Sequence, residues 1–204
     1  MNKILVIAAH PDDEVLGCGG MIARMEDVFV FFLGAGRQGE EKENSERIYK
    51  VSNILRFDFS IDGDYPDNQF DKVPLLEMVQ NIEELIEHTK PDTIFTHYRN
   101  DLNIDHRIAY QATITAARPK GEVKEIYSYE IPTSTNWGFP ISFSPDFFID
   151  ISDTVGRKIQ AYSIYTSEVG FMRDADTIKT FSFYRGQMCG LMHAEAFETV
   201  RRVI

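Results

Sequence analysis

Short apolar runs alternate with segments of helical periodicity, and this alternation is the feature that most constrains the fold. Residues 3–9 and 28–33 are apolar runs typical of buried parallel strands. Residues 40–55, which follow, carry apolar side chains at helical spacing. Strands that alternate with helices build a layered α/β fold. We therefore predict a Rossmann-like three-layer fold with a mostly parallel sheet and a C-terminal extension packed on the core.

The same patterns give the bounds of the predicted elements. Strands are expected at residues 3–9, 28–33, 57–61, 92–97, 125–131 and 147–151. Helices are expected at residues 14–25, 40–55, 75–88, 106–118 and 154–167, with further helix in residues 176–203 and a break at Arg185-Gly186. Residues 62–71 are rich in turn-forming residues. The sequence has no repeat and no linker, so we expect residues 1–204 to form one domain.

Charge and hydropathy restrict the partners. The net charge of −11 disfavours nucleic acid and anionic membranes as main partners. The longest apolar runs are too short to cross a bilayer, so stable membrane insertion is not expected. Residues 1–3 lead directly into a strand without an export signal, which favours the cytoplasm. In that compartment Cys18 and Cys189 are not expected to pair, and the glycines around Cys18 indicate a packing role.

The motif His10-Pro11-Asp12-Asp13-Glu14 directly follows the first predicted strand. In open α/β sheets, ligands bind beyond the carboxyl ends of the strands. An imidazole and a carboxylate three residues apart can hold a cation such as zinc. The alternative is a solvated turn in which Asp12 or Asp13 caps the next helix. That alternative leaves the histidine and the second acid unexplained.

A second polar cluster, residues 97–106, follows the strand predicted at residues 92–97. If both strands are parallel members of one sheet, the two clusters share an edge. His10, Asp13 and His106 would then supply three metal ligands and leave a fourth position for water, which is typical of a catalytic zinc site. Asp12, beside that water, would act as general base.

Single residues of these clusters also have ordinary structural interpretations. Asp105 alone is the natural N-cap of the helix expected to begin at His106. His97 could form a hydrogen bond inside its loop, and His88 could favour the C-terminal end of a helix. The pattern as a whole is more specific, because two acid–histidine turns follow two strands of the same type.

The two motifs resemble those of a known family. Residues 10–14, followed by Leu16-Gly17-Cys18-Gly19-Gly20, are similar to the opening motif of the PIG-L/LmbE-like family of metal-dependent N-deacetylases, and residues 101–107 are similar to its second motif. Residues 118–119, 134–137 and 194–197 also resemble bacterial members. The resemblance implies a Rossmann-like fold and the zinc-dependent removal of an acyl group, usually acetyl, from an amino sugar.

Carried over by position, the resemblance implies that His10, Asp13 and His106 bind the metal and that Asp12 is the general base. The family often has a histidine two residues before the Asp-His pair, where it can act as acid or oxyanion stabiliser. Here that position is Asn103. An asparagine can donate a hydrogen bond to an oxyanion, but it cannot deliver a proton.

The general acid is therefore left open. Asp12 could make both proton transfers, or His97 or His193 could supply an imidazole. Asp105 and His97 are expected behind the metal ligands, as partners that support them.

Three residues are candidate substrate contacts. Arg37 resembles the family's substrate-contacting basic position, although a solvated loop arginine is the alternative. Asn103 could face the reacting group. Trp137, the only tryptophan, could stack on a sugar face or pack the C-terminal part onto the core. Arg185 and Glu195 are later candidates for which a structural role is favoured.

These observations predict a zinc hydrolase that removes an N-acetyl group from an amino sugar or sugar conjugate. The alternatives are hydrolysis of another amide and a non-catalytic ligand-binding module, although residues 17–20 lack the G-x-G-x-x-G spacing of a dinucleotide loop. Fe²⁺ would also accept imidazole and carboxylate ligands. The sequence leaves open the acyl group, the aglycone and the oligomeric state, a homo-oligomer included.

Overall fold

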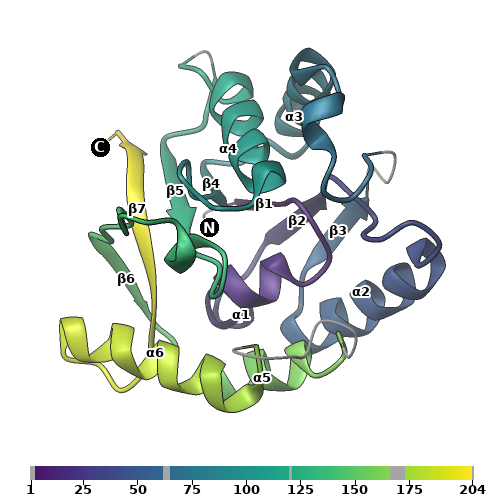
Figure 1. Cartoon of the computed structure of the whole chain (residues 1–204). Coiled ribbons are helices and arrows are strands. Elements are labelled where there is room, and N and C mark those ends of the chain that lie inside the picture. The colour runs from purple at the N-terminus through teal and green to yellow at the C-terminus, as the bar shows by residue number, and fades with distance from the viewer. Residues whose placement is uncertain (1–2, 62–64, 120, 166–172, 204) are drawn as a thin grey trace.

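The computed structural model describes residues 3–61, 65–119, 121–165 and 173–203 (Figure 1). The elements follow in chain order: β1 (Ile4–Ala8), α1 (Asp13–Arg24), β2 (Val28–Phe32), α2 (Glu41–Leu55), β3 (Asp58–Ile61), η1 (Phe70–Lys72), α3 (Leu75–Thr89), β4 (Thr93–His97), α4 (Ile104–Ala116), β5 (Glu125–Tyr129), η2 (Thr135–Trp137), β6 (Phe147–Asp150), α5 (Val155–Tyr162), α6 (Ala175–Cys189) and β7 (Ala194–Arg202).

The strands of the described residues form one sheet with the order β3-β2-β1-β4-β5-β7-β6. Strands β1 to β5 pair in parallel. The C-terminal strand β7 lies between β5 and β6 and is antiparallel to both. The predicted α/β fold with a mostly parallel sheet is confirmed.

Helices cover both faces of this sheet, which gives three layers (Figure 1). Helices α3 and α4 lie on one face, and α1, α2, α5 and α6 lie on the other. A hydrophobic core lies on each face of the sheet, and strand β1 contributes side chains to both. Leu5 and Ile7 belong to the core under α3 and α4, and Ile4, Val6 and Ala8 belong to the core on the other face. Burial on both faces explains why β1 and β2 consist of unbroken apolar runs.

The connections place the two polar motifs beside each other. The chain leaves β1 through α1 to β2 on one side, whereas β4 joins β1 on its other side. The strand order therefore reverses between β1 and β4. A crevice forms at such a switch point, beyond the carboxyl ends of the strands. The turn after β1 and the loop after β4 flank this crevice.

Glycines allow α1 to pack closely on the sheet. A Cβ atom at Gly17 would lie 2.3 Å from the ring of Tyr129, and one at Gly20 would lie 2.6 Å from Ile151. Cys18 is fully buried in the same helix, and burial raises the pKa of its thiol. The expectation that this segment needs small residues for packing is confirmed.

The C-terminal part differs from its prediction in two respects. Residues 194–202 form strand β7 instead of helix, and α6 runs through Arg185-Gly186 without a break. Acids at buried positions hid the strand: Glu195 is buried because it pairs with Lys158 at 2.6 Å. Gly186 serves close packing, because a Cβ atom there would lie 2.7 Å from the carbonyl oxygen of Leu191.

Two further predictions involve residues outside the described ranges. The helix expected at residues 154–167 ends at Tyr162 as α5, and its predicted last residues 166–167 lie outside the described part of the chain. Residues 62–64 of the expected turn region also lie outside it. No helix among the residues that the structure describes is long and apolar enough to span a bilayer.

Candidate active site

A polar cavity of about 180 Å³ opens at the carboxyl edge of the sheet. Its lining comes from the segments after four parallel strands and from the segment before α6. It comprises His10, Pro11, Asp12 and Asp13 after β1; Gly36, Arg37, Glu40 and Asn44 after β2; Asp67 and Asn68 after β3; Asn103 and His106 after β4; and Arg173.

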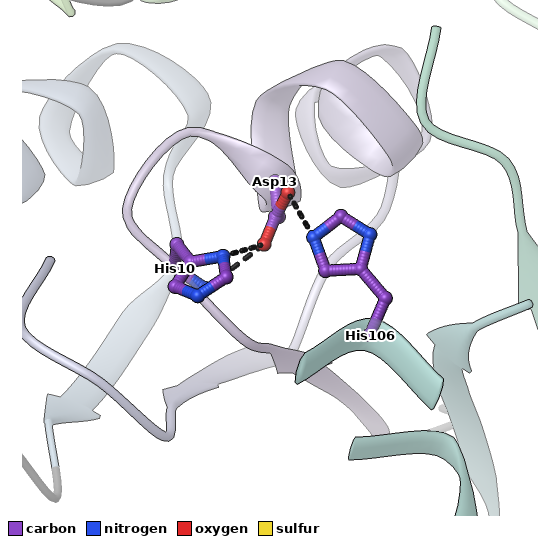
Figure 2. A group of neighbouring side chains, drawn as sticks. All are labelled: His10, Asp13 and His106. Atoms are coloured by element: carbon purple, nitrogen blue, oxygen red, sulfur yellow. Dashed lines mark hydrogen bonds and ion pairs between the residues drawn. The ribbon is translucent and has the colours of Figure 1, made fainter. Parts of the chain in front are cut away.

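The three expected metal ligands lie together in this cavity, with Asp13 facing both histidines (Figure 2). The Nδ1 atom of His10 lies 3.4 Å from Oδ2 of Asp13. The Nε2 atom of His106 lies 3.4 Å from Oδ1 of the same carboxylate. The ligand atoms that the three residues offer all lie within 4.8 Å of one another.

The second nitrogen of each imidazole has a carboxylate partner. The Nε2 atom of His10 lies 2.9 Å from Oδ2 of Asp105, and Nδ1 of His106 lies 3.1 Å from Oδ1 of Asp101. Partners of this kind fix the tautomer and the orientation of metal-binding histidines. The arrangement therefore turns one nitrogen of each ring toward Asp13. Two imidazoles and one carboxylate fit zinc or ferrous iron.

The buried acids and histidines of this group shift one another's pKa values. Burial would lower the pKa of His10, but hydrogen bonds with Asp105 and Asp13 raise it to about 10. Burial is similarly outweighed at His106, where Asp13 and the nearby Asp101 carboxylate raise the pKa to about 9. Burial would raise the pKa of Asp13, yet the neighbouring histidines hold it well below its ordinary value. Such carboxylate partners increase the basicity that makes imidazole a good ligand.

Asp12 stands at the N-cap position of α1, but its side chain makes no capping hydrogen bond. Its backbone has φ 119° and ψ −29°, a conformation that L-residues rarely adopt. The Asp12 N–H donates to Oε2 of Glu14 at 3.0 Å, and Tyr165 donates its hydroxyl to Oε1 of Glu14 at 2.7 Å. Burial raises the pKa of Glu14 to about 7. Backbone strain that the surroundings hold in place is common at functional sites.

Asp105 does not cap α4, so that prediction was wrong. The helix begins at Ile104 and not at His106, and Asn103 is its N-cap: Oδ1 of Asn103 accepts from the backbone N–H of Asp105 at 2.9 Å. The Asp105 carboxylate is thereby available to His10 and also accepts from the backbone N–H of Asn68 at 2.7 Å. It therefore ties the loop after β3 to the candidate metal ligands.

The two other candidate imidazoles lie away from the cavity lining. His97 is fully buried, and its Nε2 accepts from the backbone N–H of Ala9 at 2.9 Å. Its ring stacks on His106 with the centroids 4.1 Å apart, and burial lowers its pKa well below the ordinary value. Nδ1 of His193 lies 2.9 Å from the Ser182 hydroxyl. His97 therefore packs behind the ligand set, where a supporting residue was expected.

The candidate substrate residues divide into two groups. Arg37 and Asn103 line the cavity. Trp137 is not part of the lining and lies in η2 with its side chain half exposed. Arg185 and Glu195 also lie outside the lining, where they form buried ion pairs. These two pairs agree with the structural role that was favoured for both residues.

Sequence reasoning missed several residues of the site. Asp67, Asn68, Glu40 and Asn44 follow β3 and β2, and the strand-end rule would have suggested their loops had it been applied to every parallel strand. Asp101 was seen only as part of a motif. It accepts from the backbone N–H of Asn103 at 2.8 Å, and also from the hydroxyls of Ser134 and Thr135 at the start of η2.

Comparison with known proteins identifies a family and several relatives. The family model described as PIG-L, GlcNAc-PI de-N-acetylase, matches residues 5–117. The uncharacterized deacetylase YaiS of Escherichia coli K12 is 27% identical over 74% of this chain and 82% of its own length. The diacetylchitobiose deacetylase of Thermococcus kodakarensis is 26% identical over 98% of this chain and 84% of its own length.

Solved structures share the fold over nearly the whole chain. The conserved protein TT1542 of Thermus thermophilus has a TM-score of 0.81 at 24% identity and covers 100% of this chain and 97% of its own. The zinc-inhibited form of teicoplanin deacetylase Orf2 has a TM-score of 0.81 at 15% identity, with 98% of each chain covered. GalB of Pseudomonas putida KT2440, a 4-carboxy-2-hydroxymuconate hydratase, has a TM-score of 0.80 at 20% identity, covering 100% and 98%. At these identities the likeness concerns the fold alone, which one of these proteins uses for a different reaction.

Proposed function

Because the chain belongs to the PIG-L family of de-N-acetylases, we propose that it hydrolyses the N-acetyl amide of an amino sugar or sugar conjugate. The observation that carries the proposal is that His10, Asp13 and His106 gather in one cavity whose lining also includes Asp12. Three ligands that leave a coordination position open, beside an uncoordinated carboxylate, are the requirements of metal-assisted amide hydrolysis.

His10, Asp13 and His106 would hold a divalent cation, zinc in our proposal, which when bound supplies a Lewis acid and an activated water. The choice of zinc rests on the donor set, which ferrous iron shares. Asp105 and Asp101 would orient the two imidazoles through their second nitrogens.

Asp12 is the proposed proton carrier. Its carboxylate takes a proton as the water oxygen bonds to the acetyl carbon, and it returns that proton to the sugar nitrogen as the C–N bond breaks. The products are acetate and the free amine. We assign both transfers to Asp12, because neither His97 nor His193 lines the cavity and Asn103 cannot deliver a proton.

The cavity lining supports a polyhydroxylated substrate. Its walls are mostly polar, with Arg37, Asn103 and Asp67 among the groups that can hydrogen-bond to sugar hydroxyls. Oδ1 of Asn103 is used by the helix cap, so its amide nitrogen is the end suited to donate to substrate. Trp137 would contact only a substrate that extends beyond this cavity.

We also propose that residues 1–204 act as one domain in a reducing, cytoplasmic setting. The support is the single sheet that joins all described strands, together with Cys18 and Cys189, which are both unpaired.

Acetate release by the metal-defined protein tests the proposal. The purified chain, stripped of metal and reloaded with zinc or with ferrous iron, is incubated with free, lipid-linked and nucleotide-linked N-acetyl amino sugars. We expect metal-dependent release of acetate from at least one of these classes. A protein that binds metal and sugar without releasing acetate would instead indicate the non-catalytic module. Release from simple N-acetyl amides but from no sugar would indicate another amide as substrate.

A further inference from the structure

Arg173 reaches the candidate base from a part of the chain that the family model does not cover. The family model matches residues 5–117, whereas Arg173 lies just before α6. Its Nη1 atom lies 3.5 Å from Oδ2 of Asp12, and its side chain is 26% exposed. Both residues line the cavity. The guanidinium therefore forms an ion pair with the proposed proton carrier at the cavity wall.

A second contact holds this guanidinium in place. Nε of Arg173 donates to Oγ1 of Thr133 at 2.7 Å. Thr133 has a φ of 71°, an outlying value for a β-branched residue. The next two residues, Ser134 and Thr135, donate their hydroxyls to Asp101, the partner of His106. One short turn after β5 thus supports both a candidate metal ligand and the arginine beside Asp12.

We propose that Arg173 is a positioning residue that fixes the carboxylate of Asp12 for proton transfer, an inference that rests on the proposed function. Glu14 holds the Asp12 backbone, whereas Arg173 contacts the carboxylate itself. A planar guanidinium anchored through Nε loses little freedom when it binds a carboxylate, so it is suited to this task. Displacement of a reacting group by about 1 Å can cost roughly 100-fold in rate.

Kinetics of matched variants test the role. Arg173→Ala should lower kcat by about 10- to 100-fold while KM changes little and metal content is retained. Arg173→Lys keeps the positive charge but lacks the planar guanidinium group, so it should lose less kcat than Arg173→Ala. Added guanidinium should restore part of the kcat of Arg173→Ala. Thr133→Val, which removes only the anchoring hydroxyl, should cause a smaller loss. Arg118→Ala is the control, because Arg118 pairs with Glu83 away from the cavity.

A structural readout keeps this inference separate from the proposed function. The protein is labelled with ¹⁵N at arginine, and the NMR signals of the Arg173 side chain are identified by their loss in Arg173→Lys. We expect these signals to show slow rotation of the guanidinium group in the wild-type chain. Asp12→Asn should abolish this slow rotation. Unchanged signals in Asp12→Asn would overturn the inference whether or not the protein deacetylates sugars. Wild-type kcat in Arg173→Ala would also overturn it, and a loss confined to KM would assign Arg173 to substrate binding instead.

Discussion

Three adjacent acids at the start of α1, Asp12, Asp13 and Glu14, have different surroundings. Asp13 faces both histidines, Asp12 faces the cavity and Arg173, and Glu14 points inward to the hydroxyl of Tyr165. These surroundings fit the proposed division of the three acids between metal binding, proton transfer and support of the backbone. The Asp12 backbone between these side chains has an unusual φ of 119°.

Replacing His106 by alanine should strip the metal. The variant removes one of the two proposed imidazole ligands and leaves Asp101 without its ring partner. We expect metal analysis of the purified variant to find almost no zinc. His88→Ala, an exposed histidine in the last turn of α3, should keep the full content. Equal zinc in both variants would remove His106 from the ligand set.

Sequence reasoning placed residues that follow β1 and β4 in the site because strand ends can be located from apolar runs. It also proposed Arg37 and Trp137, of which Arg37 lines the cavity. Asp105 was misplaced because the capping role belongs to Asn103, and either residue type is a good N-cap. No sequence pattern indicated that Arg173 belongs to the site. Its position depends on how the C-terminal part packs against the turn at Thr133, which is tertiary information that no local pattern carries.

At the scale of elements, α1 connects the site to the rest of the molecule. The helix begins within the motif of residues 10–14 and packs against β7 and α5. There Glu195 accepts from the backbone N–H groups of Gly20 and Met21 at 2.8 and 2.7 Å. Lys158 of α5 donates to the same carboxylate. Small residues and buried polar groups thus fix the helix on which Asp13 lies.

Gly17→Ala should destabilise the fold. Its new Cβ would meet the ring of Tyr129 at 2.3 Å, and overpacking of this kind costs about 1–3 kcal/mol. The matched control is Gly156→Ala in α5, where nothing lies within 4 Å of the added atom. We expect urea unfolding to show a loss for the first variant and none for the second. Equal stability of the two would contradict the close approach of α1 to β5.

Breaking the buried ion pair between Arg185 and Glu130 should make the free energy of unfolding depend on pH. Burial already raises the pKa of Glu130 above 4.5, although Arg185 bonds both its oxygens. Arg185→Met leaves a buried carboxylate alone, which costs about 3–5 kcal/mol while that carboxylate is charged. The folded state then favours the protonated form of Glu130. The loss of unfolding free energy should therefore grow as pH rises above 4.5, the ordinary pKa of the glutamate side chain.

Unfolding free energies of Arg185→Met at about pH 5 and about pH 8 check this sign. We expect the larger deficit, relative to wild type, at the higher pH. In the double variant with Glu130→Gln the dependence should disappear. A deficit that shrinks as pH rises would show that the carboxylate is not the cause.

At the scale of the whole molecule, the C-terminal strand completes a sheet that begins at the N-terminus. Strand β7 lies between β5 and β6, and β6 has no other partner among the described strands. The sequence pattern predicted strands β1 to β6, whereas β7 was missed because its buried acids disguise it. The partners of these acids, Lys158 and Arg99, come from distant elements.

Removal of β7 should therefore unfold more than its own segment. A chain that ends at Gly190 loses the fully buried Phe197 and the Glu195 carboxylate that holds α1. We expect circular dichroism to show one cooperative transition for the full chain and no cooperative transition for this truncation. A chain that lacks only residues 203–204 should melt like the full chain. A cooperative transition in the long truncation would contradict the one-domain proposal.

In the proposed reaction, Asp12 moves the proton while His10, Asp13 and His106 hold the metal. The most direct measurement is acetate release by Asp12→Asn, with bound metal determined on the same sample and the wild-type chain beside it. We expect full metal content and a loss of roughly 100-fold or more in turnover, because the asparagine can neither accept nor return a proton. Near wild-type turnover by the metal-loaded variant would contradict proton transfer by Asp12.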